Sequence, residues 1–129
     1  MNWWQQLILR RYETHGLADK HVASMACLAE ILGGHWQVFA YEQERAVFIL
    51  GRSRQYPEAG EVHMWADGGN LLKAIRQFMR DAWSHSDYPV LTGVVMNSRL
   101  ERCIRRFGWR VIGVGVHGER YWMAQRYAS

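Results

Sequence analysis

The segment with the clearest structural pattern is Val90–Met123, VLTGVVMNSRLERCIRRFGWRVIGVGVHGERYWM. After Pro89, a run of apolar and β-branched residues extends over Val90–Met96, a pattern typical of a buried strand. Asn97 or Ser98 then caps a helix, because both side chains accept hydrogen bonds from the free N–H groups of a first helical turn. The segment therefore predicts a strand that leads directly into a helix.

The predicted helix carries one apolar stripe at the spacing i, i+3, i+4 and i+7. The residues of that stripe are Leu100, Cys103, Ile104 and Phe107. Gly108 ends the helix, since glycine adopts the left-handed conformation without steric cost. We expect Trp109–Val116 to form a second strand, His117-Gly118 a turn, and Glu119–Met123 an antiparallel return strand.

The residues before Val90 are also predicted to form a series of helices and strands. Residues 2–15 favour a helix, although LILRRYE within them could instead form a strand. Glu61–Ala66 alternates, with Val62 and its i+2 neighbours on one face and Glu61, His63 and Trp65 on the other. The other expected elements are a helix over Leu17–Leu32, strands over His35–Tyr41 and Ala46–Gly51, and a helix from Leu71 to Trp83.

One spacing resembles the closing segment of the GNAT acyltransferase superfamily. Its residues are Asn97, Leu100, Ile104, Arg106, Gly108 and Trp109, and the order of elements is similar from about residue 17 onward. The resemblance implies one α/β domain over residues 1–129, with helices on both faces of a mixed, mostly antiparallel sheet. It also implies a central parallel pair, Glu61–Ala66 and Val90–Met96, that splays to admit the pantetheine arm of acetyl-CoA.

The same resemblance implies acetyl transfer from acetyl-CoA to a small or protein amine. Such a reaction needs a base for the amine and a hydrogen-bond donor for the developing oxyanion. Glu61 and His63 share a face of the strand that commonly carries the base in this superfamily, so either is a candidate. Each is equally well explained as an ordinary outward-facing polar residue.

The cofactor loop is shorter than in the superfamily, where it reads Arg/Gln-x-x-Gly-x-Gly/Ala. Gly68, Gly69 and Asn70 would form a reduced cradle for the pyrophosphate at a helix N-terminus, with Asn97 near the cofactor. The alternative is a short strand-to-helix turn in which Asn70 is only the N-cap. Asp67 would add a negative charge near the phosphates. We therefore expect acetyl-CoA to bind weakly or not at all.

A second departure lies at Ile104, where the superfamily usually has a tyrosine general acid. The two departures suggest an eroded enzyme, or a GNAT-like module without catalysis, and such modules resemble small proteins carried by tailed bacteriophages, some within the virion. The pair Trp3-Trp4 would then be a protein-partner anchor, although a lid over the core explains it too.

The composition further limits the class of protein and its expected ligands. The chain has 129 residues, 49% of them hydrophobic, enough for one core. We expect no membrane span, signal peptide or zinc site, and the two cysteines suggest a cytoplasmic protein, in a host cytoplasm or virion if of phage origin. Arg99, Arg102 and Arg106 form a basic stripe that could bind phosphates or simply be solvated. Nucleic-acid binding is not expected, because no aromatic residue interleaves this stripe.

Overall fold

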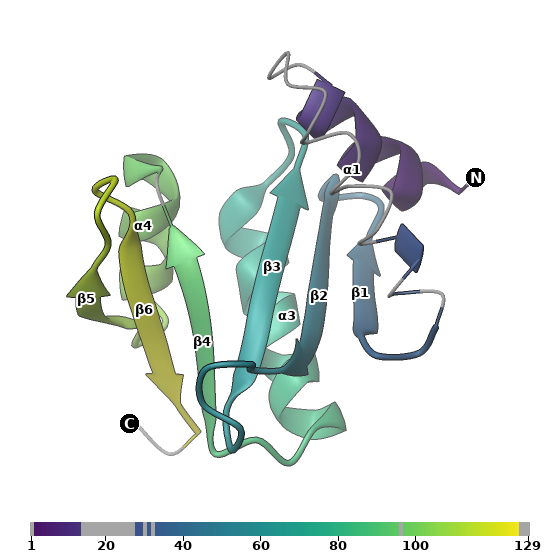
Figure 1. Ribbon diagram of the computed structural model, residues 1–129. Coiled ribbons are helices and arrows are strands. Elements are labelled where there is room, and N and C mark those ends of the chain that lie inside the picture. Colours follow the sequence, from purple (N-terminus) through teal and green to yellow (C-terminus); the bar gives the residue numbers. More distant parts are fainter. Residues whose placement is uncertain (1, 14–27, 30, 32, 96, 127–129) are drawn as a thin grey trace.

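The computed structural model describes residues 2–13, 28–29, 31, 33–95 and 97–126. Its helices are α1 (Trp3–Glu13), α3 (Leu71–His85) and α4 (Ser98–Arg105), and its strands are β1 (Gln37–Tyr41), β2 (Ala46–Arg52), β3 (Gly60–Ala66), β4 (Val90–Val95), β5 (Arg110–Val114) and β6 (Arg120–Gln125) (Figure 1). The chain thus begins with the expected helix rather than a strand. The predicted helix over Leu17–Leu32 lies almost entirely outside the described residues.

The strands form one mixed sheet in the order β1-β2-β3-β4-β6-β5. Every neighbouring pair is antiparallel except β3–β4, which is parallel as predicted. The β3–β4 ladder contains only the pairs Gly60–Leu91 and Glu61–Thr92, and beyond them the two strands diverge (Figure 1). The sheet is therefore open in its middle.

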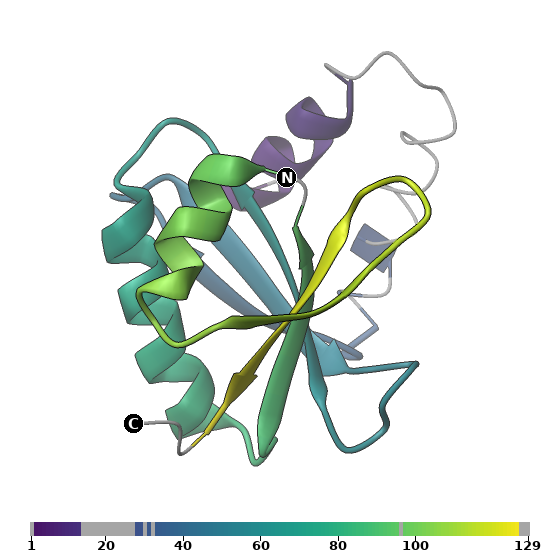
Figure 2. The ribbon, with the colours of Figure 1, turned by 90° about the vertical axis from the view of Figure 1, so that its left-hand side faces the viewer.

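Helices cover both faces of the sheet, α3 and α4 on one and α1 on the other (Figure 2). On the first face the rings of Phe48 and Phe78 stack with centroids 4.3 Å apart. On the second face Leu7 and Ile8 of α1 pack against Val47. Because β2 contributes alternate residues to both cores, it is buried almost throughout. Each large apolar side chain buried in this way stabilises the fold by about 1.5–3 kcal/mol.

Trp3 and Trp4 are half-buried and pack against the core under α1. The guanidinium of Arg45 lies 5.2 Å from the centre of the Trp3 ring, a cation–π contact. These contacts favour the lid over the exposed anchor, while a protein partner at Trp3-Trp4 stays a prediction.

The loop of the closing hairpin is longer than the predicted His117-Gly118 turn. The Gly115 N–H donates to the Glu119 carbonyl at 2.7 Å, and the Gly118 N–H donates to the Gly115 carbonyl at 3.2 Å. The Glu119 carboxylate also accepts from the His117 N–H at 2.9 Å. This side chain supplies an acceptor inside the loop, so the strands end earlier than the sequence pattern indicated.

Arg126 fixes the start of β4. Its guanidinium donates to the carbonyls of Trp83 and Ser86, each at 2.7 Å, and to that of Tyr88 at 3.0 Å. It also lies 4.8 Å from the centre of the Trp83 ring. One side chain at the end of β6 thereby ties the last turn of α3 to the segment that enters the parallel strand pair.

We expect Arg126→Ala to lower the free energy of unfolding by about 2–4 kcal/mol, because three carbonyls lose a charged donor. The matched control is Arg120→Ala, which removes an exposed ion pair with Glu101 (3.0 Å) and should cost below about 1 kcal/mol. Urea unfolding of both variants measures the difference. Equal losses would show that Arg126 is an ordinary surface residue.

The turn between β3 and α3 contains two glycines with different requirements. Gly68 has φ +71°, and a Cβ there would meet no atom within 4 Å. A Cβ on Gly69 would overlap the backbone carbonyl of Glu44. Gly68 is therefore needed for its conformation and Gly69 for close packing against the β1–β2 turn.

Gly69→Ala should cost about 3 kcal/mol or more, because a backbone carbonyl cannot move aside as a flexible side chain can. Gly68→Ala should cost only about 1–2 kcal/mol, the penalty of the left-handed conformation. Thermal unfolding of the two variants, which add the same methyl group to adjacent positions, gives the comparison. A larger loss at Gly68 would contradict this assignment.

Candidate functional site

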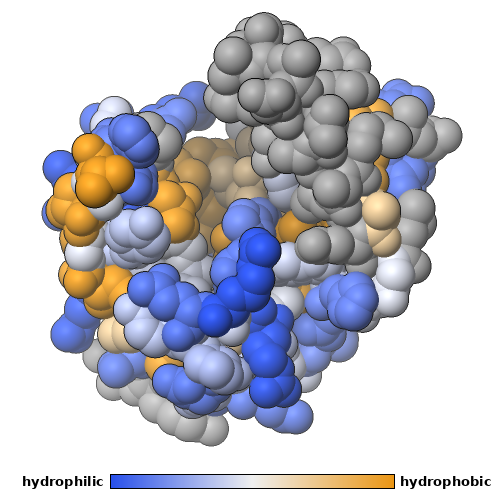
Figure 3. All heavy atoms as spheres, viewed as in Figure 1, coloured by the Kyte–Doolittle hydropathy of each residue, from blue (hydrophilic) through white to orange (hydrophobic). Residues whose placement is uncertain are grey.

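The divergence of β3 and β4 opens a cavity through the middle of the sheet. This central cavity, of about 200 Å³, is lined by Val62 and Met64 of β3, Gly93 of β4, and Ile104 and Trp109 behind them, among others. Figure 3 shows a recess at the top of the molecule with an apolar floor. Along this stretch no ladder pair joins β3 to β4, so within the part of the chain that the structure describes the backbone N–H groups on the facing edges have no strand partner.

A second hollow, of about 420 Å³, lies where α3 and α4 begin. Among the residues that line this helix-end hollow are Gly68, Gly69, Asn97 and Arg99. It shares Met64, Trp65 and Leu100 with the central cavity, so the two adjoin. The structure thus brings three of the four expected cofactor residues to one surface, and the fourth, Asn70, follows Gly69 directly.

Both asparagines act as helix caps. Asn70 Oδ1 accepts from the Lys73 N–H at 3.1 Å. Asn97 Oδ1 accepts from the N–H groups of Arg99 and Leu100 at 2.9 and 3.2 Å. Asn70 is therefore an N-cap, and the side chain of Asn97 is engaged in the same way.

Capping leaves donors at the start of α3. The N–H groups of Leu71 and Leu72 have no acceptor among the described residues, as is usual for a first helical turn. Together with the dipole of a 15-residue helix, they favour an anion in the helix-end hollow.

The negative charges around this hollow are compensated. Asp67 lies 3.6 Å from Arg10 and 3.5 Å from Arg45, so it does not face the hollow as an isolated anion. Glu44 lies 3.3 Å from the Lys73 ammonium and accepts a hydrogen bond from Gln77 at 3.0 Å. Burial alone would raise the pKa of the Glu44 carboxyl, but the hydrogen bonds from Gln77 and Lys73 lower it. Neither acid therefore excludes a phosphate.

On the opposite face of the sheet a groove of about 320 Å³ contains Glu61 and His63. Within this sheet-face groove His63 Nε2 lies 2.6 Å from Glu61 Oε2, so the two candidates form a pair. Val62, His63, Gly93 and Val94 line both the groove and the central cavity. His63 therefore stands at the junction of the two faces.

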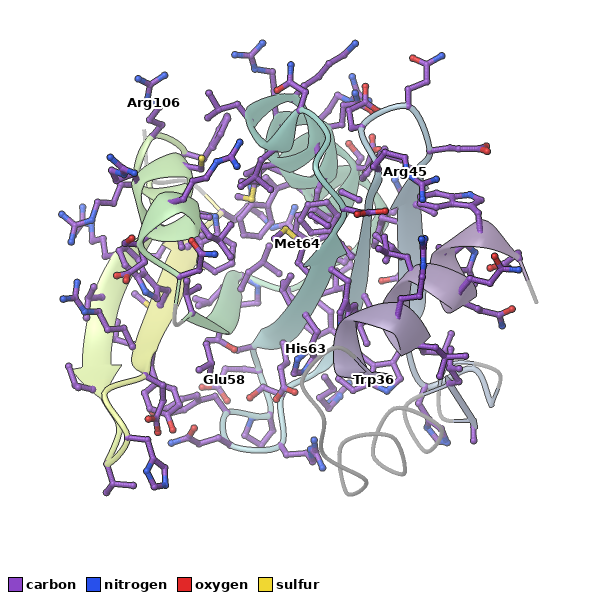
Figure 4. The ribbon with its side chains drawn as sticks, turned by 90° about the horizontal axis from the view of Figure 1, so that it is seen from above. Trp36, Arg45, Glu58, His63, Met64 and Arg106 are labelled. Atoms are coloured by element: carbon purple, nitrogen blue, oxygen red, sulfur yellow. The ribbon has the colours of Figure 1, made fainter. Side chains whose placement is uncertain are left out.

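Aromatic rings fix the orientation of His63. Trp36 meets the imidazole edge-on with centroids 5.4 Å apart, and Trp65 stacks at 6.3 Å. Figure 4 shows His63 beside Trp36 and Met64 on the other face. Trp36 occupies the space beside Gly51, where a Cβ would come within 2.6 Å of its ring. A carboxylate can only accept a hydrogen bond, so Nε2 would be the donor in this contact, and in a neutral imidazole the lone pair would then lie on Nδ1.

The position of Ile104 agrees with the sequence prediction. Its side chain is buried and lines the central cavity, and it cannot donate a proton. The nearby Trp109 Nε1 donates to Met79 Sδ at 3.3 Å.

Sequence reasoning missed Trp36, Gly51 and Glu44, because each acts through a contact between distant segments. The alternation of residues along β3, which placed Glu61 and His63 on one face, was the only local sequence signal for the surroundings of His63.

The described residues hold no group of three or more His, Cys, Asp or Glu side chains arranged for a metal ion. Among the described helices, none combines the length and apolar character that a membrane span requires.

No protein-family model matches the chain, and no curated protein matches it. Solved structures do. An N-acetyltransferase from Staphylococcus aureus Mu50 superposes with TM-score 0.64 at 14% identity, covering 80% of this chain and 75% of that one. A ribosomal-protein-alanine N-acetyltransferase from Brucella melitensis gives 0.59 at 14% identity, over 84% and 80%.

A third solved structure is an acetyltransferase of the GNAT family from Streptococcus pneumoniae. It gives TM-score 0.53 at 7% identity, over 79% of this chain and 73% of that one. At these identities the similarity establishes architecture, and the order and direction of the strands agree with it. The chain has the GNAT fold.

Proposed function

We propose that this protein is an acyl-CoA-dependent N-acyltransferase that transfers an acetyl group to an amine. The observation that carries the proposal is the position of His63. It is paired with Glu61 and lines both the cavity between the splayed strands and the groove on the opposite face. A base at that junction can meet a thioester from one side and an amine from the other.

The residues present would hold the cofactor with fewer contacts than the full loop of the superfamily provides. The free N–H groups of Leu71 and Leu72 and the side chain of Arg99 would hold the pyrophosphate in the helix-end hollow. The central cavity would take the pantetheine arm. Because the turn that contains Gly68 and Gly69 is short, fewer backbone donors reach the phosphates, and the affinity for acetyl-CoA is low.

Bound acetyl-CoA would supply an acyl thioester, and the remaining chemistry belongs to the chain. His63 Nδ1 accepts a proton from the amine, and Glu61 stabilises the imidazolium that results. Unpaired N–H groups on the facing edges of β3 and β4 are available to the carbonyl oxygen as it gains charge. Ile104 offers no acid, so a thiolate would leave before solvent protonates it, which would limit the rate where departure is slow.

A module without catalysis is the second candidate, and Ile104 together with the shortened turn favours it. In that case the GNAT fold serves an interaction, for example in a bacteriophage virion, with the Trp3-Trp4 region as a contact for a protein partner. The two candidates differ in whether the parent protein turns over acetyl-CoA at all.

Binding of CoA tests the cofactor part of the proposal. At a hundredfold excess over its dissociation constant, CoA should stabilise the fold by about 2.7 kcal/mol, and we expect no stabilisation at micromolar CoA. Gly93→Leu should abolish calorimetric binding by filling the central cavity. Gly93→Ala is the control, because its Cβ would make only ordinary contacts at 3.5 and 3.8 Å. Undiminished binding by Gly93→Leu would place CoA elsewhere.

Removal of the base tests the catalytic part. His63→Gln should lower kcat by about a hundred- to ten-thousandfold. The KM for acetyl-CoA should change much less, because His63 lines the cavity for the pantetheine arm but not the helix-end hollow that holds the pyrophosphate. Glu61→Gln should lower kcat less, because the imidazole remains. Glu58→Gln, an exposed carboxylate on the β2–β3 loop, should change nothing. Turnover that survives His63→Gln would contradict His63 as the base. Absence of turnover from the parent protein with every amine would favour the second candidate.

A further inference from the structure

The sheet-face groove has an unusual composition for an exposed surface. Large aliphatic side chains converge on it from two strands, and three of them are strongly exposed: Val94 by 54%, Ile112 by 44% and Val114 by 66%. Tyr56, 42% exposed, and the half-buried Tyr121 add aromatic surface. An exposed apolar surface of this kind usually marks a binding site rather than a solvated face.

The charge of the groove is equally selective. Glu61 and its partner His63 are the ionisable groups among the described lining residues, apart from the two tyrosines, and no lysine or arginine lines it. An ammonium group is therefore attracted to Glu61, whereas an anionic acceptor finds no cation to pair with. A second or third positive charge on the acceptor finds no further carboxylate in the lining.

We infer that the acceptor is a primary amine carried on a bulky apolar or aromatic group, with a single positive charge. The inference rests on the proposed N-acyltransferase function and names its substrate class. The amine lies against the Glu61–His63 pair, and the apolar group lies on Val94, Ile112 and Val114. The same chemistry occurs in a free arylalkylamine and in the N-terminus of a peptide that begins with an apolar residue.

The reaction balances with these groups. The ammonium loses one proton to His63, the C–N bond forms, and the C–S bond of the thioester breaks. A second proton leaves the nitrogen and, through solvent, protonates the departing thiolate. The products are an N-substituted amide and the free thiol of CoA, with one proton released.

The test measures acetyl-CoA turnover with acceptors that differ in one property at a time. 2-Phenylethylamine should have a KM at least tenfold below those of ethanolamine, which lacks the apolar group, and spermidine, which adds charge. L-Glutamate should not react. Two tetrapeptides, one with N-terminal Phe and one with N-terminal Asp, distinguish a peptide acceptor from a free amine. A KM for the Phe peptide below that for 2-phenylethylamine assigns the groove to a peptide N-terminus. The reverse order of the two KM values assigns it to a free amine.

The variants use one isosteric change at three positions. Val94→Thr with Val114→Thr should raise the KM for 2-phenylethylamine about tenfold, because two methyl groups in the groove become hydroxyls. Val116→Thr is the matched control: Val116 is 94% exposed and lies outside the groove lining, so its KM should match that of the parent. An equal effect of the double variant and of Val116→Thr on the KM would overturn the assignment.

Failure of the inference and failure of the proposed function give different results. Turnover in which spermidine or ethanolamine equals 2-phenylethylamine overturns the substrate class and leaves acyl transfer standing. If no amine is turned over, the proposed function is overturned. In that case, calorimetric binding of 2-phenylethylamine that is weakened by Val94→Thr with Val114→Thr would still support the apolar amine site. A dimer that dissociates in the same double variant, seen by sedimentation, would assign the surface to a second copy and overturn the inference.

Discussion

The structure depends on a parallel ladder that stops after two residue pairs. Gly60–Leu91 and Glu61–Thr92 hold β3 and β4 together, and the Thr92 hydroxyl adds a hydrogen bond to the Gly60 carbonyl at 3.2 Å. Beyond this point each strand is paired with its other neighbour, β2 or β6, and a single apolar cluster on the α3 side still joins the two halves of the sheet. The cavity, the junction at His63 and the free edge N–H groups all follow from that early end of pairing.

Charge compensation is the second constraint on the site. Two carboxylates lie near the helix ends, and each is held by cations from another part of the chain: Asp67 by Arg10 and Arg45, and Glu44 by Lys73. Arg45 also has φ 54°, a conformation that costs energy for a residue with a side chain. Its contacts with Asp67 and Trp3 offset that strain and connect the β1–β2 turn to α1. The helix-end hollow is therefore able to receive an anion although acidic residues border it.

The sequence predicted the fold well because its signals are local. The capped helix from Asn97, the glycine stop at Gly108 and the alternation on β3 depend on near neighbours, and each was found where expected. The site was only half predictable. Glu61 and His63 could be placed on one face by their spacing, but their 2.6 Å contact and the rings around His63 depend on tertiary packing. Asp67 was expected to repel phosphates, and the ion pairs that prevent this come from residues 57 and 22 positions earlier in the chain. The hairpin loop at Gly115–Glu119 was underestimated because a side-chain cap inside a loop leaves no periodic pattern.

The parting of β3 and β4 creates the proposed binding site for the cofactor. Residue-resolved NMR of the backbone amides during a titration with CoA tests it directly. We predict chemical-shift changes and slower hydrogen exchange at the free edges of β3 and β4 beyond Glu61 and Thr92, and at the first turn of α3, with β1 unaffected. Changes confined to other elements, or none at CoA concentrations that saturate a millimolar site, would contradict the account.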